Sequence, residues 1–222
     1  MQAAAFFDLD NTLINANCGL RTLVHYFFSG KIGLFQAFRM GISYLLYKLR
    51  GSDPVRFFSS IYRFMEGRSY EQESKACSDF FTKNLEKRIF LEAKELVEEH
   101  RQKGHLIVII TNSVEFKINR IRELLSPDII IATTLKTDKG LFTGEVERVS
   151  FGKNKLKFAK ELAEEKGIDL KASYAYSDNS SDIALLDAIG HPVAVNPQPR
   201  LKRYARQKGW KILRFRRKGG LK

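Results

Sequence analysis

Residues 6–14 read Phe6-Phe7-Asp8-Leu9-Asp10-Asn11-Thr12-Leu13-Ile14, and this stretch decides the fold. The apolar run over residues 3–7 predicts a strand that is buried on both faces of a sheet, and two carboxylates follow it. In an open parallel sheet the carboxyl ends of the strands form the ligand crevice, so Asp8 and Asp10 are expected to lie there. Carboxylates so close repel each other, and a divalent cation with oxygen ligands relieves the repulsion. For this pair alone, a strand end followed by an Asx-type turn is the alternative interpretation.

Strands and helices alternate along most of the remaining chain. Apolar runs predict strands over residues 106–110, 128–132, 173–176, 191–195 and 211–215. Amphipathic patterns predict helices over residues 91–103, 152–166 and 199–208, and Asp138-Lys139-Gly140 predicts a hairpin turn leading into residues 142–146. This alternation predicts an α/β fold with a doubly wound parallel sheet.

Residues 17–90 differ from the flanking sequence because they lack strand-like alternation. Apolar residues at helical spacing give one apolar face, at Leu34, Phe38, Ile42, Leu45 and Leu49. We therefore predict a helical cap over residues 17–90, inserted after the first strand of a core made of residues 1–16 and 91–222. Polar residues interrupt the apolar run too often for a membrane span. The excess of basic over acidic residues suits an amphipathic surface at a membrane, and a helical bundle packed over the core is the alternative.

The chain is basic and contains two cysteines. Its 222 residues suffice to bury a core, and its formal net charge is +13 at pH 7. Ten Lys or Arg residues and no acidic residue fall within residues 201–222. This basic C-terminal tail either contacts anionic lipid or nucleic acid or is a solvated end. Cys18 and Cys77 predict neither a disulfide framework nor a zinc site, which favours a reducing cytoplasm, and no signal peptide is expected.

Polar residues also follow two later strands. Thr111-Asn112-Ser113 comes directly after residues 106–110. Its hydroxyl and amide groups suit the binding of an anion at the start of the next helix, and a simple N-cap is compatible with that role. Asp178 and Asp182 form a second carboxylate pair after the strand over residues 173–176. We expect these groups to meet Asp8 and Asp10 at one edge of the sheet.

Other ionisable residues give weaker signals. Lys153 and Lys155 fall in the first turn of a predicted helix, where a cation opposes the helix dipole unless an anion is bound nearby. The histidines show no mutual spacing that suggests a set of metal ligands, and structural roles are expected for His25, His100, His105 and His191.

Four segments together resemble the motifs of the haloacid dehalogenase (HAD) superfamily over the whole chain. They are Asp8-Leu9-Asp10-Asn11-Thr12, the strand ending in Thr111, the Gly152-to-Lys155 segment, and Ser177-Asp178-Asn179-Ser180-Ser181-Asp182. The insertion lies where that superfamily has its helical cap. Residues 191–197 and Gly209-Trp210 are similar to the subfamily IB hydrolases, which include phosphoserine phosphatases.

The resemblance implies a phosphoryl-transfer mechanism and a Mg²⁺ ion. Asp8 would attack phosphorus and form an aspartyl-phosphate. Asp10 would protonate the leaving alkoxide and then take a proton from the hydrolytic water. The superfamily's dehalogenases lack an acid at that position, so Asp10 favours phosphoryl transfer. Mg²⁺ would be bound by the carboxylates of Asp8 and Asp178 and by the backbone carbonyl of Asp10.

The remaining motif residues would support the substrate and the metal. Asp182 would lie behind the metal ligands or orient a metal-bound water. The Thr111 hydroxyl and the Asn112 backbone amide would hold a phosphoryl oxygen, and Lys155 would offset charge on Asp8 and the phosphate. Lys155 is preferred to Lys153 because the apolar face of the helix begins directly after it.

The sequence thus predicts a cytoplasmic, Mg²⁺-dependent phosphomonoester hydrolase. A phosphomutase is one alternative, and a basic membrane- or nucleic-acid-binding protein on an idle fold is another, although the intact acids argue against the latter. Residues 15–17 include no acidic residue of the kind that binds the substrate amine in phosphoserine phosphatases. The aromatic, Arg-rich cap suggests a lipid-linked phosphomonoester, with the cap and the basic tail in peripheral contact with a membrane. A small soluble phosphomonoester is the competing expectation, and nucleic acid is not expected.

Overall fold

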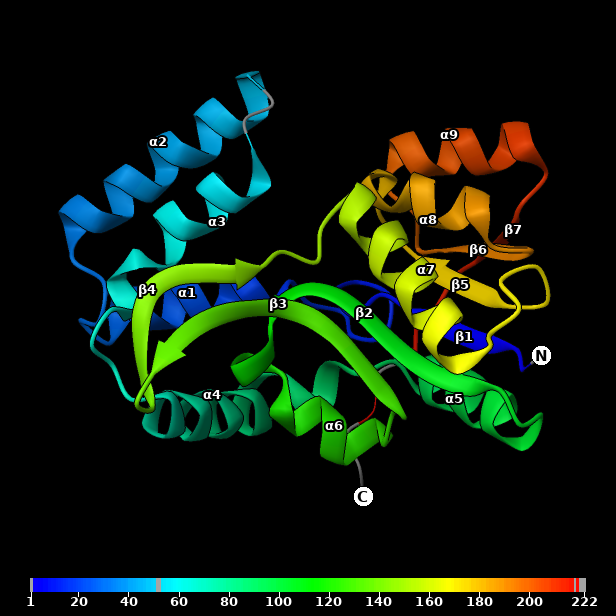
Figure 1. The fold of residues 1–222 in the computed structure, drawn as a ribbon, viewed down its shortest axis with the longest axis horizontal. Helices are drawn as coiled ribbons and strands as arrows, with labels where there is room; N and C mark the ends of the chain where they lie inside the picture. The colour runs from blue at the N-terminus through cyan, green and yellow to red at the C-terminus, as the bar shows by residue number, and fades with distance from the viewer. Residues whose placement is uncertain (1, 51–52, 218, 220–222) are drawn as a thin grey trace.

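The computed structural model describes residues 2–50, 53–217 and 219. Within them, seven strands form one sheet in the order β4-β3-β2-β1-β5-β6-β7 (Figure 1). The strands are β1 (Ala4–Phe7), β2 (Leu106–Val114), β3 (Ile129–Asp138), β4 (Leu141–Arg148), β5 (Tyr174–Ser177), β6 (His191–Val195) and β7 (Lys211–Leu213). Neighbouring strands are parallel except β3 and β4, which form an antiparallel hairpin. The predicted α/β fold with a mostly parallel, doubly wound sheet is confirmed.

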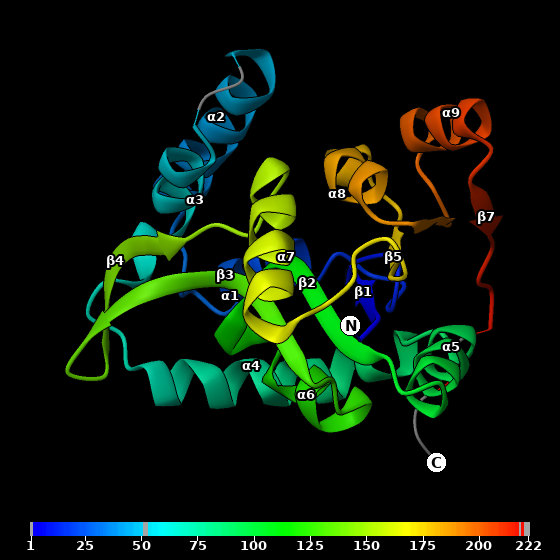
Figure 2. The same ribbon diagram turned by 45° about the vertical axis from the view of Figure 1, so that its right-hand side comes forward.

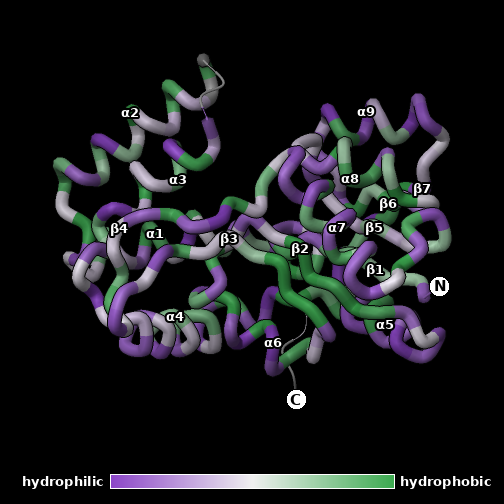
Figure 3. The backbone as a smooth tube through the Cα atoms, viewed as in Figure 1, coloured by the Kyte–Doolittle hydropathy of each residue, from purple (hydrophilic) through white to green (hydrophobic). Residues whose placement is uncertain are grey.

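Strand β1 lies in the middle of the sheet because all four of its residues can be buried. It pairs with β2 on one side and β5 on the other. Ala5 and Phe7 belong to the apolar core on one face of the sheet, and Ala4 and Phe6 belong to the core on the other. The hydropathy colouring in Figure 3 shows the same apolar centre, most clearly along β2. A central β1 places the residues that follow it at the middle of the sheet edge.

Helices cover both faces of the sheet (Figure 2). On one face lie α5 (Leu91–Gln102) and α6 (Asn119–Leu125), and on the other lie α7 (Lys153–Lys166), α8 (Ile183–Ala188) and α9 (Pro199–Lys208). The predicted helices match these closely, and α9 has the predicted bounds because Pro199 starts it and Gly209, at φ 69°, ends it.

Three strands, β2, β3 and β4, run further than predicted, and β7 is shorter. β2 continues through Thr111-Asn112-Ser113 to Val114, which pairs with Thr133 of β3 after a register shift. A short 3₁₀ turn follows, and α6 starts only at Asn119. The expectation that Thr111-Asn112-Ser113 stands at the start of a helix is therefore wrong, because pairing with the long β3 outweighs the turn preference of these polar residues. β7 ends at Leu213 rather than at residue 215.

The inserted residues are helical. They form α1 (Cys18–Phe28), α2 (Leu34–Arg50), α3 (Pro54–Tyr62) and α4 (Tyr70–Asn84), with 3₁₀ turns at Arg63–Met65 and Glu86–Arg88. In Figure 1, α2 and α3 project away from the sheet, whereas α4 runs beneath the β3–β4 hairpin. Within the described residues, no helix is long and apolar enough to cross a membrane.

The β3–β4 hairpin packs with these helices. Its Leu135 and Phe142 share an apolar cluster with Tyr26, Tyr62 and Met65. The Gly67 N–H donates to the Phe142 carbonyl at 2.8 Å, and the Tyr70 N–H donates to the Gly140 carbonyl at 2.9 Å. The division into a helical cap of residues 17–90 and a core of residues 1–16 and 91–222 stays a prediction. That prediction did not include the contacts between the β3–β4 hairpin and the helical insertion.

Candidate active site

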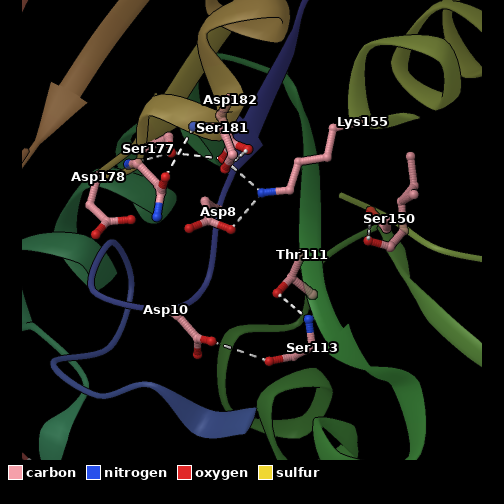
Figure 4. Close-up of polar contacts among 12 residues, drawn as sticks. Asp8, Asp10, Thr111, Ser113, Ser150, Lys155, Ser177, Asp178, Ser181 and Asp182 are labelled. Atoms are coloured by element: carbon pink, nitrogen blue, oxygen red, sulfur yellow. Dashed lines mark hydrogen bonds and ion pairs between the residues drawn. The ribbon is translucent and has the colours of Figure 1, made fainter. Parts of the chain in front are cut away.

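The predicted polar groups meet where β1, β2 and β5 end (Figure 4). Asp8 directly follows β1, Asp178 directly follows β5, and Thr111 lies within β2. All three side chains are buried, as are Asp10 and Asp182. Three neighbouring strands of one sheet therefore bring the carboxylates and the hydroxyl close together (Figure 4).

Lys155 reaches from the first turn of α7 into the centre of this cluster. Its Nζ donates to Asp8 Oδ1 at 2.8 Å and to Asp182 Oδ2 at 2.7 Å. Asp182 Oδ2 also accepts from the Ser177 hydroxyl at 2.8 Å. Burial alone would lower the pKa of Lys155, but the charges of Asp182 and Asp8 more than offset this and raise it. Lys155 is therefore a permanent cation here, whereas Lys153 is exposed.

The single positive charge of Lys155 does not neutralise the negative charges of the buried carboxylates. Burial raises the pKa of Asp8 well above its ordinary value, although Lys155 opposes the shift. Burial also raises the pKa of Asp178 to about 6, against the hydrogen bond that Gln198 donates to it. A second positive charge at this place would favour the ionised forms of both groups.

This charge imbalance and the donor set fit a hard divalent cation. Carboxylate and carbonyl oxygens are the ligands that Mg²⁺ prefers. Among the described residues, no group of three His, Cys, Asp or Glu side chains is placed to hold a metal. The predicted ligand set needs only two such side chains, those of Asp8 and Asp178, because its third ligand is the backbone carbonyl of Asp10.

Asp10 lies on the side of the cleft that faces the helical insertion. Its Oδ1 accepts from the Cys18 N–H at the start of α1 at 2.9 Å, and its Oδ2 accepts from the Ser113 hydroxyl at 3.4 Å. Burial raises the pKa of Asp10, and the hydrogen bonds from Cys18 and Ser113 oppose the rise. A carboxyl group held in place with a raised pKa is suited to donate a proton.

The cleft between these groups is small and polar. Its volume is about 70 Å³, and Asp8, Asp10, Asn112, Lys155 and Asp178 are among its lining residues. The Thr111 hydroxyl oxygen accepts from the Ser113 N–H at 3.1 Å, which fixes the backbone next to Asn112. The space suits a compact anion held by short-range polar contacts.

The structure brings together every residue that the motifs predicted, and it adds three. Ser113 contacts Asp10, and Ser177 contacts Asp182. Gln198 contacts Asp178 twice, because its side-chain amide donates to Asp178 Oδ2 at 3.2 Å and its N–H donates to the Asp178 carbonyl at 2.9 Å. Ser177 stands inside the last quoted motif and Ser113 in the stretch Thr111-Asn112-Ser113, so both could have been proposed from the sequence. Gln198 carries no sequence signal, because it comes from the start of α9.

Comparisons with known proteins agree with this geometry. A family model described as haloacid dehalogenase-like hydrolase matches residues 5–187. The chain therefore belongs to the haloacid dehalogenase-like hydrolases.

Its relatives and structural neighbours define the type further. The chain is 34% identical over its whole length to the inhibition of morphological differentiation protein of Streptomyces azureus, of which it covers 81%. It is 29% identical over 97% of its length to a phosphoserine phosphatase of Mycobacterium tuberculosis, of which it covers 72%. A crystal structure of a Bordetella pertussis protein of unknown function has the same fold, with a TM-score of 0.86 at 24% identity over 96% of this chain and 98% of that one. The predicted phosphoserine-phosphatase-like class is confirmed, and the chain is an enzyme of the phosphatase class.

Proposed function

We propose that the chain is a Mg²⁺-dependent phosphomonoester hydrolase that works through an aspartyl-phosphate on Asp8. The observation that carries the proposal is the arrangement around Asp8: Lys155 contacts one of its oxygens, and Asp178 and Asp10 lie beside it in a cleft of about 70 Å³. Mg²⁺ fits the ligands named above and, when bound, offsets negative charge on the phosphoryl group.

The reaction has two steps. In the first, an Asp8 carboxylate oxygen attacks phosphorus, the bond between phosphorus and the ester oxygen breaks, and Asp10 gives its proton to the departing alkoxide. In the second, Asp10 takes a proton from water, and the water oxygen attacks the phosphorus of the aspartyl-phosphate. The bond between phosphorus and Asp8 breaks, which regenerates the carboxylate and yields inorganic phosphate.

Four residues would stabilise these steps without changing covalently. Lys155 offsets negative charge on Asp8 and on the phosphoryl group. The Thr111 hydroxyl and the Asn112 N–H donate to a phosphoryl oxygen. Asp182 holds Lys155 in place through its 2.7 Å contact and thereby positions the cation.

A phosphatase assay with p-nitrophenyl phosphate tests the proposal. We expect hydrolysis that requires Mg²⁺ and that falls below a few per cent of wild type in Asp8→Asn, because the amide keeps the shape but loses the nucleophile. Asp79→Asn, at an exposed acid of α4, is the matched control and should keep full activity. Substantial turnover by folded Asp8→Asn would refute the nucleophile assignment.

We further propose peripheral contact with the cytoplasmic face of an anionic membrane through α2. Its exposed apolar side chains include Leu34, Phe35 and Phe38, and Phe35 is 72% exposed. Residues 18–52 contain no acidic residue but include several basic ones. Apolar and basic groups on one amphipathic helix favour the surface of an anionic bilayer. Both cysteines are free and buried, in keeping with a reducing compartment.

Arg216 and Arg217, near the end of the basic tail, are held away from α2, whereas most of the preceding tail residues lie in α9 and β7. The Arg216 and Arg217 N–H groups donate to Glu92 Oε1, and the Leu91 N–H donates to the Arg217 carbonyl at 2.9 Å. These contacts fix this last part of the tail at the start of α5, which lies far from α2 in both views (Figures 1 and 2). Lys218 and residues 220–222 lie outside the described residues.

Vesicle sedimentation at physiological salt tests the membrane contact. We expect binding to vesicles rich in phosphatidylglycerol, weaker binding to neutral vesicles, and a loss of binding in the double variant Phe35→Ser/Phe38→Ser. Leu141→Ser removes a 47% exposed apolar side chain on the hairpin and should bind like wild type. Equal binding by the double variant, or none by the wild type, would remove the membrane claim.

A further inference from the structure

A large apolar cavity lies among α1, α2 and α3. Its volume is about 560 Å³, which falls in the range of about 300–1,000 Å³ typical of small-molecule sites. Most of its lining side chains are apolar, among them Leu20, Leu23, Val24, Met40, Phe57 and Ile61. Its size and lining suit an apolar ligand rather than a compact polar one.

The cavity is continuous with the cleft that contains Asp8. Asp10, Asn17 and Asn112 line both spaces. In the proposed reaction Asp10 protonates the oxygen of the leaving group, so that oxygen must lie beside Asp10. With the phosphoryl group in the polar cleft, the rest of the leaving group can extend past Asp10 into the apolar cavity.

The cavity offers no partner for a charged leaving group. Apart from Asp10, none of its described lining residues is an acid, a lysine or an arginine. Two sets of buried charges lie nearby, and neither lines the cavity. Glu73 contacts Lys31 at 2.8 Å and Arg68 at 3.3 Å, whereas the buried Lys117 donates to the Tyr62 hydroxyl at 3.3 Å and lies over the rings of Tyr62 and Tyr26. An amine and a carboxylate placed here would lose their hydration without compensation. An amino-acid phosphate is therefore a poor fit.

We propose that this cavity binds the apolar chain of a single-chain phosphomonoester, such as the phosphate ester of a long-chain primary alcohol. The inference rests on the proposed function, because it takes Asp10 as the proton donor to the leaving group. Some residues of the cavity lining are themselves exposed, namely Leu20, Val24 and Phe28 of α1 and Tyr44 of α2. A chain longer than the cavity would leave it beside these residues.

A series of alkyl phosphates from ethyl to octyl tests the proposal, used below the concentrations at which they form micelles. Each methylene buried in the cavity should raise kcat/KM by about fourfold until the chain outgrows it, mainly through a lower KM. We expect a gain of at least about a hundredfold between ethyl and octyl phosphate. Phosphoserine should be a poorer substrate than hexyl phosphate.

Gly41 allows the cavity to be filled without breaking the fold. It lies on α2 in the cavity lining, and a Cβ added there meets no atom within 4 Å. Leucine is also a better helix former than glycine. We expect Gly41→Leu to reduce the octyl-to-ethyl ratio of kcat/KM at least tenfold. Gln36→Leu puts the same side chain on the same helix outside the cavity and should leave that ratio within about twofold of wild type.

The outcomes separate this inference from the proposed function. Mg²⁺-dependent hydrolysis of ethyl phosphate with no gain from chain length would overturn the inference and leave the function standing. An equal loss of the ratio in Gly41→Leu and Gln36→Leu would also overturn it, because the effect would then not come from the cavity. Failure to hydrolyse any member of the series would instead refute the proposed function.

Discussion

Asp10 is held by hydrogen bonds from two different elements. The Cys18 N–H comes from the start of α1, and the Ser113 hydroxyl comes from β2. The side chain of Asp10 is thereby directed toward the apolar cavity, while Asp8 is directed toward Lys155. Two carboxylates two residues apart have different surroundings, which is how one can serve as nucleophile and the other as acid.

The role of Asp10 predicts a dependence on the leaving group. Asp10→Asn cannot protonate the departing oxygen, so hydrolysis of alkyl phosphates should fall by about 10²–10⁴-fold. p-Nitrophenyl phosphate should lose far less in the first step, because its leaving group needs little protonation. Steady-state kinetics with both substrates measure the difference. Equal losses for the two substrates would contradict the acid role.

At the scale of elements, Gly144 on β4 determines how closely the hairpin approaches the helical insertion. It has φ 80°, and an added Cβ would lie 3.1 Å from Glu66 Cβ and 3.3 Å from the Arg63 carbonyl oxygen. We expect Gly144→Ala to lower the unfolding free energy by roughly 2 kcal/mol, through backbone strain and crowding together.

Gly30→Ala is the matched control for that substitution. Gly30 also has positive φ, at 73°, but a Cβ there meets nothing within 4 Å. Gly30→Ala should therefore lower the unfolding free energy only through backbone strain, by roughly 1 kcal/mol. Urea denaturation of the three proteins gives the comparison, and equal losses in both variants would show that the contact with Arg63 and Glu66 adds nothing.

Three of the four histidines gather at the opposite end of the strands. His100 Nδ1 lies 2.8 Å from His105 Nδ1, and His100 Nε2 lies 2.8 Å from the Tyr176 hydroxyl. The His191 ring stacks on Tyr174 at 4.5 Å. Burial, and then the neighbouring His105, lower the pKa of His100 to about 4. His100 is thus neutral in the folded protein near neutral pH.

This lowered pKa makes stability depend on pH. The unfolded chain binds a proton at His100 below about pH 6.5, whereas the folded chain does so only near pH 4. The stability contributed by neutral His100 is therefore complete above pH 6.5 and is lost as the pH falls toward 4. Between pH 7 and pH 5, wild type should lose about 1 kcal/mol more unfolding free energy than His100→Gln. The same dependence of unfolding free energy on pH in wild type and His100→Gln would contradict this role of His100.

The local pattern predicted most elements because burial and helix ends leave clear marks in the sequence. The run over residues 3–7 and the Pro199 and Gly209 boundaries of α9 are examples. The extension of β2 was not predictable, because Thr111-Asn112-Ser113 is polar and its strand pairing depends on the length of β3. The histidine cluster was missed because its members come from different elements: His100 lies in the last turn of α5, His105 directly precedes β2, and His191 begins β6. The apolar cavity depends on how α1, α2 and α3 pack, which the spacing of residues in one helix does not determine.

At the scale of the whole molecule, the site holds four buried carboxylates and one buried lysine. This excess of negative charge predicts that a bound metal cation stabilises the fold. A cation that binds only the folded state at 100 times its dissociation constant adds about 2.7 kcal/mol. Millimolar Mg²⁺ should therefore raise Tm by several degrees. Asp178→Asn should abolish the shift, whereas Asp79→Asn should keep it. Thermal scans with and without Mg²⁺ measure this, and a shift that survives in Asp178→Asn would exclude that residue as a ligand.

The β3–β4 hairpin has a consequence for recombination between relatives. A chimera with crossover points at residues 17 and 90 would take Tyr62 and Met65 from one parent and Phe142 from the other, although these side chains share one apolar cluster. It would also join Gly67 of one parent to the Phe142 carbonyl of the other. A transplanted insertion therefore has to bring the outer hairpin with it. The insertion and the outer hairpin, residues 17–90 and 134–148, are separate in sequence but would have to be exchanged together.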